Sequence, residues 1–85
     1  MVKNITVYER LTKVIEVGTD RFGNPEYHYE PKLVQLGAPQ DCESLETYLE
    51  YFRKGLNITV HEVEDHKIRV WLTGCRNPFY ITWED

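Results

Sequence analysis

The chain has 85 residues, of which 41% are hydrophobic and 13% aromatic, and its formal net charge is −4. A chain of this length is expected to form a single domain, residues 1–85, and its apolar content is too high for a disordered chain. The acidic balance argues against a partner recognised through its phosphates, because such binding needs clustered Lys and Arg side chains.

The N-terminus and the cysteines predict the cellular setting. The first residues, MVKNITVYER, contain no apolar signal core, and no run approaches the roughly 20 apolar residues of a membrane span. Cys42 and Cys75 are fewer cysteines than a short secreted disulfide framework uses. We therefore expect an intact small gene product that starts at Met1 and stays in the cytoplasm with free thiols. A Cys42–Cys75 disulfide remains the alternative.

Two β-strands are predicted ahead of a helix. Residues 3–17 are rich in β-branched side chains, and their imperfect alternation predicts a bend or bulge near Arg10–Thr12. The turn residues GTDRFGNP follow, and residues 25–36 form the second strand. Pro31 cannot donate a ladder hydrogen bond, so we expect this strand either at a sheet edge or bent at Pro31.

One amphipathic helix is predicted within DCESLETYLEYFRKG, residues 41–55. Either Asp41 or Ser44 can cap its start, because each side-chain oxygen can accept a free amide hydrogen. The apolar stripe should pack on the sheet, with Leu49 and Phe52 nearly fully buried. It recurs at helical spacing and comprises Leu45, Tyr48, Leu49, Phe52 and Leu56.

Two strands, residues 58–64 and 67–73, are expected to pair across a short Asp65–His66 turn. Pairing Glu64 with Lys67 places Glu62 opposite Arg69, so that opposite charges face each other twice.

The last strand, residues 79–84, is expected to pair with residues 67–73, with Leu72 opposite Phe79. This register makes one face wholly apolar, and a slip by one residue would scatter the apolar set. That face comprises Ile68, Val70, Leu72, Phe79, Ile81 and Trp83.

These elements predict an α+β fold in the order β-β-α-β-β-β, with an antiparallel sheet of four to five strands and one helix packed on one face. We call the face beneath the helix the inner face and the opposite face the outer face. We expect Ile58, Val60, Trp71 and Tyr80 on the outer face. The competing interpretation is that loops or the N-terminal segment cover this patch as a second small core.

Catalytic and metal sites are weakly indicated. In HEVEDH, His61 and His66 lie on either side of the predicted turn, so they should face differently and not share a zinc ion. Cys75 lies beside Arg76, which could lower a thiol pKa, but no base is recognisable nearby. We therefore assign no catalytic residue, no cofactor and no metal, and the alternative of a small enzyme or redox or metal protein rests on Cys75 or on the stretch from His61 to His66.

The exposed aromatic side chains favour a non-catalytic protein-binding module, because Trp, Tyr and Arg dominate interface energies. The expected partner is a protein of unknown identity, with a homodimer as one form, and we expect an inhibitor or adaptor of the kind that viruses and mobile elements encode. Single-stranded nucleic acid ranks third, since the aromatic residues lack a basic groove. The candidate contact residues are Ile58, Val60, Arg69, Trp71 and Tyr80.

Overall fold

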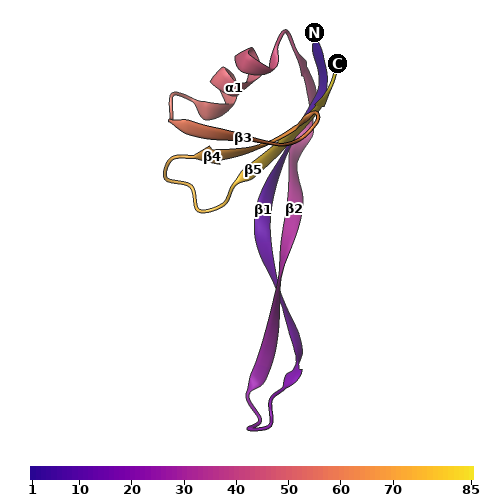
Figure 1. The fold of residues 1–85 in the computed structure, drawn as a ribbon, viewed down its shortest axis with the longest axis vertical. Coiled ribbons are helices and arrows are strands. Elements are labelled where there is room, and N and C mark those ends of the chain that lie inside the picture. The colour runs from indigo at the N-terminus through magenta and orange to yellow at the C-terminus, as the bar shows by residue number, and fades with distance from the viewer.

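A computed structural model describes all 85 residues as one antiparallel sheet and one helix, which confirms the α+β fold in the order β-β-α-β-β-β (Figure 1). The elements are β1 (Val2–Thr19), β2 (Pro25–Cys42), α1 (Leu45–Arg53), β3 (Ile58–Glu64), β4 (Lys67–Leu72) and β5 (Phe79–Glu84). The sheet has five strands in the order β2-β1-β5-β4-β3, so β2 and β3 are its edges. The edge position expected for the strand that contains Pro31 is confirmed.

The sheet has two parts of different character. Near the chain ends, β1 pairs with β5 as far as Glu9, and β5, β4 and β3 complete the body of the molecule. Beyond that point the ladder contains only β1 and β2, and the backbone amide of Arg10 donates a last hydrogen bond to the carbonyl of Pro78 at 3.0 Å. We call this two-stranded extension, residues 10–33, the arm. It runs away from the body on the side opposite α1 (Figure 1), and it makes the molecule 57 Å long and only 25 by 21 Å across.

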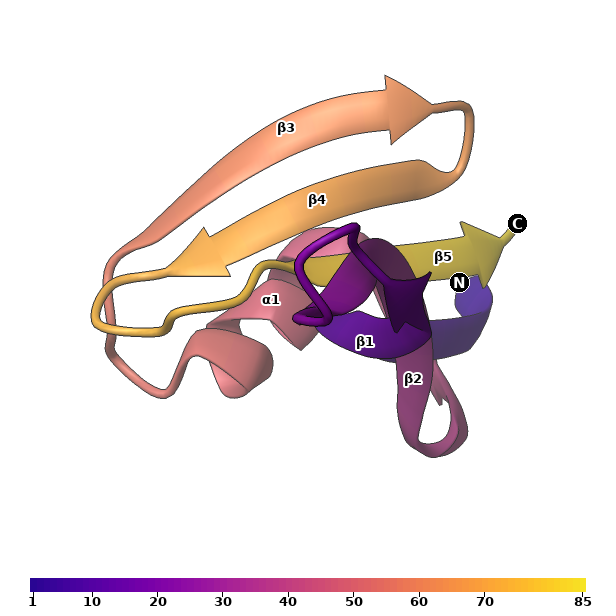
Figure 2. The ribbon, with the colours of Figure 1, turned by 90° about the horizontal axis from the view of Figure 1, so that it is seen from below.

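The core is small because the helix covers only the inner face of the body (Figures 1 and 2). The edge of the Phe52 ring packs on Phe79, with ring centroids 5.4 Å apart. No helix residue is fully buried, so the expectation that Leu49 and Phe52 are nearly fully buried is wrong; both are half-buried. The hydrophobic residues that are fully buried are Ile5, Val7, Ile68, Val70, Leu72 and Ile81.

The helix begins at the later of its two candidate caps. Ser44 is the N-cap, and its side-chain oxygen accepts a hydrogen bond from the backbone amide of Thr47 at 3.1 Å. Asp41, the other candidate cap, instead accepts from the backbone amide of Asn4 at 3.0 Å and so ties β2 to β1. Cys42 therefore ends β2 and lies outside the helix.

Two details of the strand pairing differ from the expectation while the inner face survives. Val70 pairs with Phe79, and Ile68 with Ile81, which is a shift of two residues from the expected register. A shift of two keeps every side chain on its own face, because alternation has a period of two. The bulge expected near Arg10–Thr12 is absent there; the irregularities of the β1–β2 ladder lie between Val2 and Val7 and between Glu16 and Gly18.

The β3–β4 pairing corrects the assignment of two candidate contact residues. Glu64 pairs with Lys67 as expected, but the ladder then skips Val63, and Glu62 pairs with Ile68 and not with Arg69. This bulge reverses the alternation of the rest of β3. Ile58 and Val60, expected on the outer face, therefore lie opposite Leu72 and Val70 on the inner face: the pairs are Ile58–Leu72 and Val60–Val70.

Candidate protein-contact surface

Three of the five predicted contact residues lie on the outer face of the body. Arg69 is paired with Tyr80, which is paired in turn with Tyr8 of β1, and Trp71 follows Arg69 by two residues along β4. Strand alternation gives all four side chains one common face. The amino group of Lys67 lies 5.5 Å from the centre of the Tyr80 ring, which adds a cation–π contact to this face.

Trp71 is the most exposed of these aromatic side chains. It keeps 42% of its surface exposed, as the alternation of β4 predicted. Its neighbour across the β3–β4 ladder is Thr59, whereas the expected pairing of Leu72 with Phe79 would have placed Tyr80 beside it on β5. The N-terminal segment does not cover it, because β1 is itself a strand within the sheet. On the outer face Trp71 is thus exposed, whereas Arg69, Tyr80 and Tyr8 are half-buried.

Ile58 and Val60 make a different surface. Ile58 is half-buried against the core, whereas Val60 is 45% exposed, because β3 is an edge strand and the helix does not extend over it. Val63, the bulged residue, is 43% exposed beside it. A bulge and the glutamates of an edge strand hinder pairing with another chain, so this edge is a weaker candidate for contact.

A larger exposed apolar surface lies on the arm, and sequence reasoning did not single it out. One face of the arm carries four cross-strand pairs, and we call it the tyrosine face. Tyr29 is 64% exposed, Val14 53%, Tyr27 51% and Leu33 45%. The pairs are Arg10–Leu33, Thr12–Pro31, Val14–Tyr29 and Glu16–Tyr27.

On the opposite face of the arm, charged side chains find partners within the chain. Lys13 lies opposite Glu30, whose carboxylate is 3.2 Å from the imidazole of His28. Leu11 and Ile15 on this face are both half-buried, and they pair with the long side chains of Lys32 and His28. The alternation of EYHYE opposite TKVIE was the available signal: it places both tyrosines and the valine on one face, with Glu16, and Lys13, His28 and Glu30 on the other.

The tip of the arm is a well-formed turn. The Asp20 carboxylate accepts hydrogen bonds from the backbone amides of Phe22 and Asn24 at 2.8 and 3.0 Å. Gly23 has φ +82°, a conformation that costs other residues energy. Phe22 is 75% exposed, and the guanidinium of Arg21 lies 5.0 Å from the centre of its ring.

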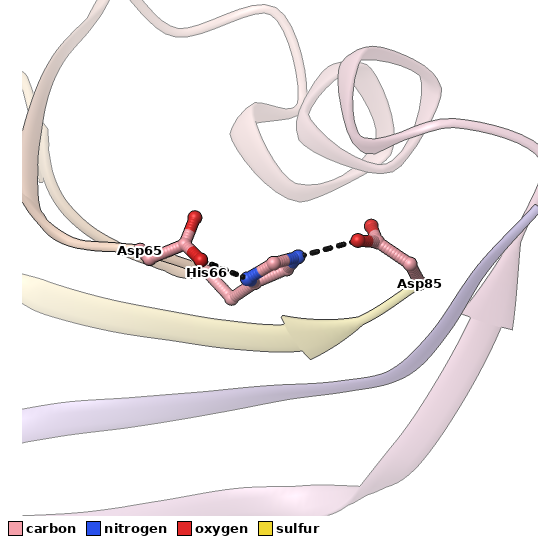
Figure 3. A network of polar contacts seen from close by, with 3 residues as sticks. All are labelled: Asp65, His66 and Asp85. Carbon is pink, nitrogen blue, oxygen red and sulfur yellow. Dashed lines mark hydrogen bonds and ion pairs between the residues drawn. The ribbon is translucent and has the colours of Figure 1, made fainter.

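The inner face carries a hollow of about 460 Å³ at the β3–β4 turn, where α1 does not reach. His66 bridges two carboxylates there: its Nε2 is 2.7 Å from Asp85 and its Nδ1 3.1 Å from Asp65 (Figure 3). The hydrogen bond to Asp85 raises the pKa of His66; partial burial opposes this, and the negative charges of Asp65 and Asp85 add to it. The walls of the hollow include Glu62, Glu64, Ile68 and Trp83.

The residues considered for catalysis do not converge. Cys75 is half-buried in the β4–β5 loop and Cys42 ends β2; both are free thiols. His61 pairs with Arg69 on the outer face, whereas His66 lies at the turn beside Trp83. The hollow contains neither Cys75 nor His61. No group of three or more His, Cys, Asp or Glu side chains is placed to hold a metal ion.

Comparison with known proteins adds no relative: no protein-family model, no curated protein and no solved structure matches the chain. No helix is both long enough and apolar enough to cross a membrane.

Proposed function

We propose that the protein is a non-catalytic protein-binding module, an inhibitor or adaptor that works through its outer face and its arm. The observation that carries the proposal is a set of exposed aromatic side chains that no element of the chain covers: Trp71 on the body, and Tyr27 and Tyr29 on the arm. Contiguous exposed apolar patches on small domains mark interaction sites. The acidic chain and the scattered basic residues favour a protein over a nucleic acid as the partner.

The shape of the molecule supports the same proposal. Its radius of gyration is 16.9 Å, whereas a compact domain of this length has about 12 Å. A free two-stranded hairpin is at best marginally stable in water. An arm of this length, with apolar side chains exposed along one face, is better suited to contact another molecule than to stabilise its own.

The test is affinity capture from extracts of the organism that encodes the chain, with quantitative mass spectrometry. Trp71→Ala should lower the affinity for a captured protein by about 30-fold, as loss of an interface hot spot does. Tyr51→Ala is the matched control, since Tyr51 is an aromatic residue of α1 that is 73% exposed, away from both surfaces. Equal capture by wild type and Trp71→Ala would exclude the outer face as the contact.

A further inference from the structure

The arm exposes more surface than a monomer of this size accounts for. The accessible surface of the chain is 6336 Å², whereas a compact monomer of 10.1 kDa exposes about 5,300 Å². The excess of about 1,000 Å² is close to the roughly 800 Å² that each partner buries in a standard protein–protein interface. The protein therefore carries about one interface's worth of surface beyond its own fold.

The tyrosine face is the part of the arm whose apolar and charged side chains have the fewest partners within the chain. Its apolar side chains are 45% exposed or more, while Leu11 and Ile15 on the opposite face are half-buried; Val17, which the ladder skips, is 59% exposed. Its charged residues, Arg10 and Glu16, form no ion pair within the chain, although His28 and Glu30 on the opposite face do. Both the apolar area and the charges of the tyrosine face are available to an occupant.

The charges on this face are arranged symmetrically about its centre. Arg10 and Glu16 stand three residues on either side of Lys13 along β1, with Thr12 and Val14 between them on the same face. A two-fold axis at the level of Lys13, perpendicular to the strands, places β1 of one copy antiparallel over β1 of the other. Each Arg10 then faces the Glu16 of the other copy, and each Thr12 faces a Val14.

The same operation is compatible with the apolar residues of β2. Each residue of β2 lies at the same height along the arm as its partner on β1, and the partners of Arg10, Thr12, Val14 and Glu16 are Leu33, Pro31, Tyr29 and Tyr27. Leu33 of one copy faces Tyr27 of the other, and Pro31 faces Tyr29. An isologous interface must be self-complementary in this way, because the same patch supplies both sides. The alternative two-fold axis, along the strands, would place Arg10 over Leu33 and leave both charges unpaired.

On this basis we propose that the occupant of the tyrosine face is a second copy of this chain, packed face to face and antiparallel on the arm. The inference rests on the proposed function, since it names one partner of the same protein-binding surface. Two arms about 10 Å apart, the usual spacing of packed sheets, would exclude water from Val14, Tyr27, Tyr29 and Leu33. The arms would then stabilise each other where one alone is marginal.

The test is sedimentation equilibrium of the full chain over a range of concentrations, with charge variants. Arg10→Glu and Glu16→Arg should each weaken the dimer about tenfold or more, because the symmetric contact loses two ion pairs and gains two repulsions. The double variant, Arg10→Glu with Glu16→Arg, exchanges the charges and should restore the dimer to within about threefold of the wild type. Lys32→Glu is the control, since Lys32 lies on the opposite face and should leave the dimer unchanged.

Three outcomes would overturn the inference: a wild-type chain that stays monomeric up to about 1 mM, a dimer that ignores both single reversals, or a double variant no better than either single one. Circular dichroism and urea midpoints check that each variant folds. A monomer whose captured protein depends on Trp71 would overturn this inference and leave the proposed function standing. A symmetric dimer with no Trp71-dependent partner would do the reverse.

Discussion

His66 joins the turn between β3 and β4 to the end of β5. Its imidazole contacts Asp65 and Asp85, and its backbone carbonyl accepts from the backbone amide of Trp83 at 3.3 Å. The ring of Trp83 lies 5.7 Å from the imidazole. Both carboxylates favour the protonated ring, so the folded state binds this proton more tightly than the unfolded chain, in which a histidine pKa is about 6.5.

The sign of the pH dependence follows from this raised pKa. The stabilisation by protonated His66 is complete below the unfolded pKa and is lost as the pH rises through the higher folded pKa. Urea midpoints of wild type and His66→Gln should therefore differ most in mild acid and converge in mild alkali. His61→Gln is the control, since His61 is exposed and makes no ion pair. A difference that grew as the pH rose would contradict the assignment, and an NMR titration of Asp85→Asn should show a lower His66 pKa.

For single residues, the sequence correctly predicted which face of the sheet a side chain occupies wherever the alternation along the strand is unbroken. Trp71 is exposed and Ile81 is buried, as expected from their neighbours along the strand. Ile58 and Val60 were assigned to the wrong face because one bulged residue, Val63, reverses the alternation between the turn and the rest of β3. The charge pairing that favoured a regular register is too weak an interaction to decide against a bulge.

The stability of α1 depends strongly on the cap at its first turn, because the helix is short. It has nine residues, fewer than an isolated helix needs in water, and none of them is fully buried. The Ser44 cap satisfies an amide that would otherwise lack a partner.

Loss of this cap should therefore be measurable. Ser44→Ala should lower the free energy of unfolding by about 0.5–2 kcal/mol, whereas Ser44→Asp should be nearly neutral, because a carboxylate also caps and suits the helix dipole. Chemical denaturation followed by circular dichroism measures both. Equal losses in the two variants would mean that Ser44 acts through another contact.

The arm shows what element-level patterns leave out. The composition of residues 3–17 and 25–36 predicted two strands with a turn between them, and the structure has that hairpin. The patterns did not indicate that the pairing of β1 with β5 stops at Glu9. That point is set by the start of β5 at Phe79, which lies far along the chain from β1. They also did not indicate that β2 continues through Gly37–Asp41, where the tie between Asp41 and Asn4 holds an irregular stretch in the ladder.

The whole molecule consists of a body with a small buried core and an extended arm, and the two should respond differently to substitution. Ile81 is fully buried among β1, β4 and β5, so Ile81→Ala should lower the free energy of unfolding by about 2–5 kcal/mol. Leu49 is half-buried on the face of α1 that packs on the sheet, so Leu49→Ala should lower the free energy of unfolding by only about 1–2 kcal/mol. Urea denaturation decides; a larger loss at Leu49 would place the main core beneath the helix and not between the strands.

The arm is proposed to be a contact element that pairs face to face with the arm of a second copy. Distances between spin labels test it most directly, with Cys42 and Cys75 first replaced by serine. A label at Thr12→Cys lies one residue from the proposed axis, so its two copies should be close, within about 25 Å. A label at Thr19→Cys lies six residues from the axis, so its two copies should be about 40 Å apart at 3.4 Å per residue. Similar distances at the two positions, or no dipolar coupling at Thr12, would contradict the antiparallel pairing of the arms.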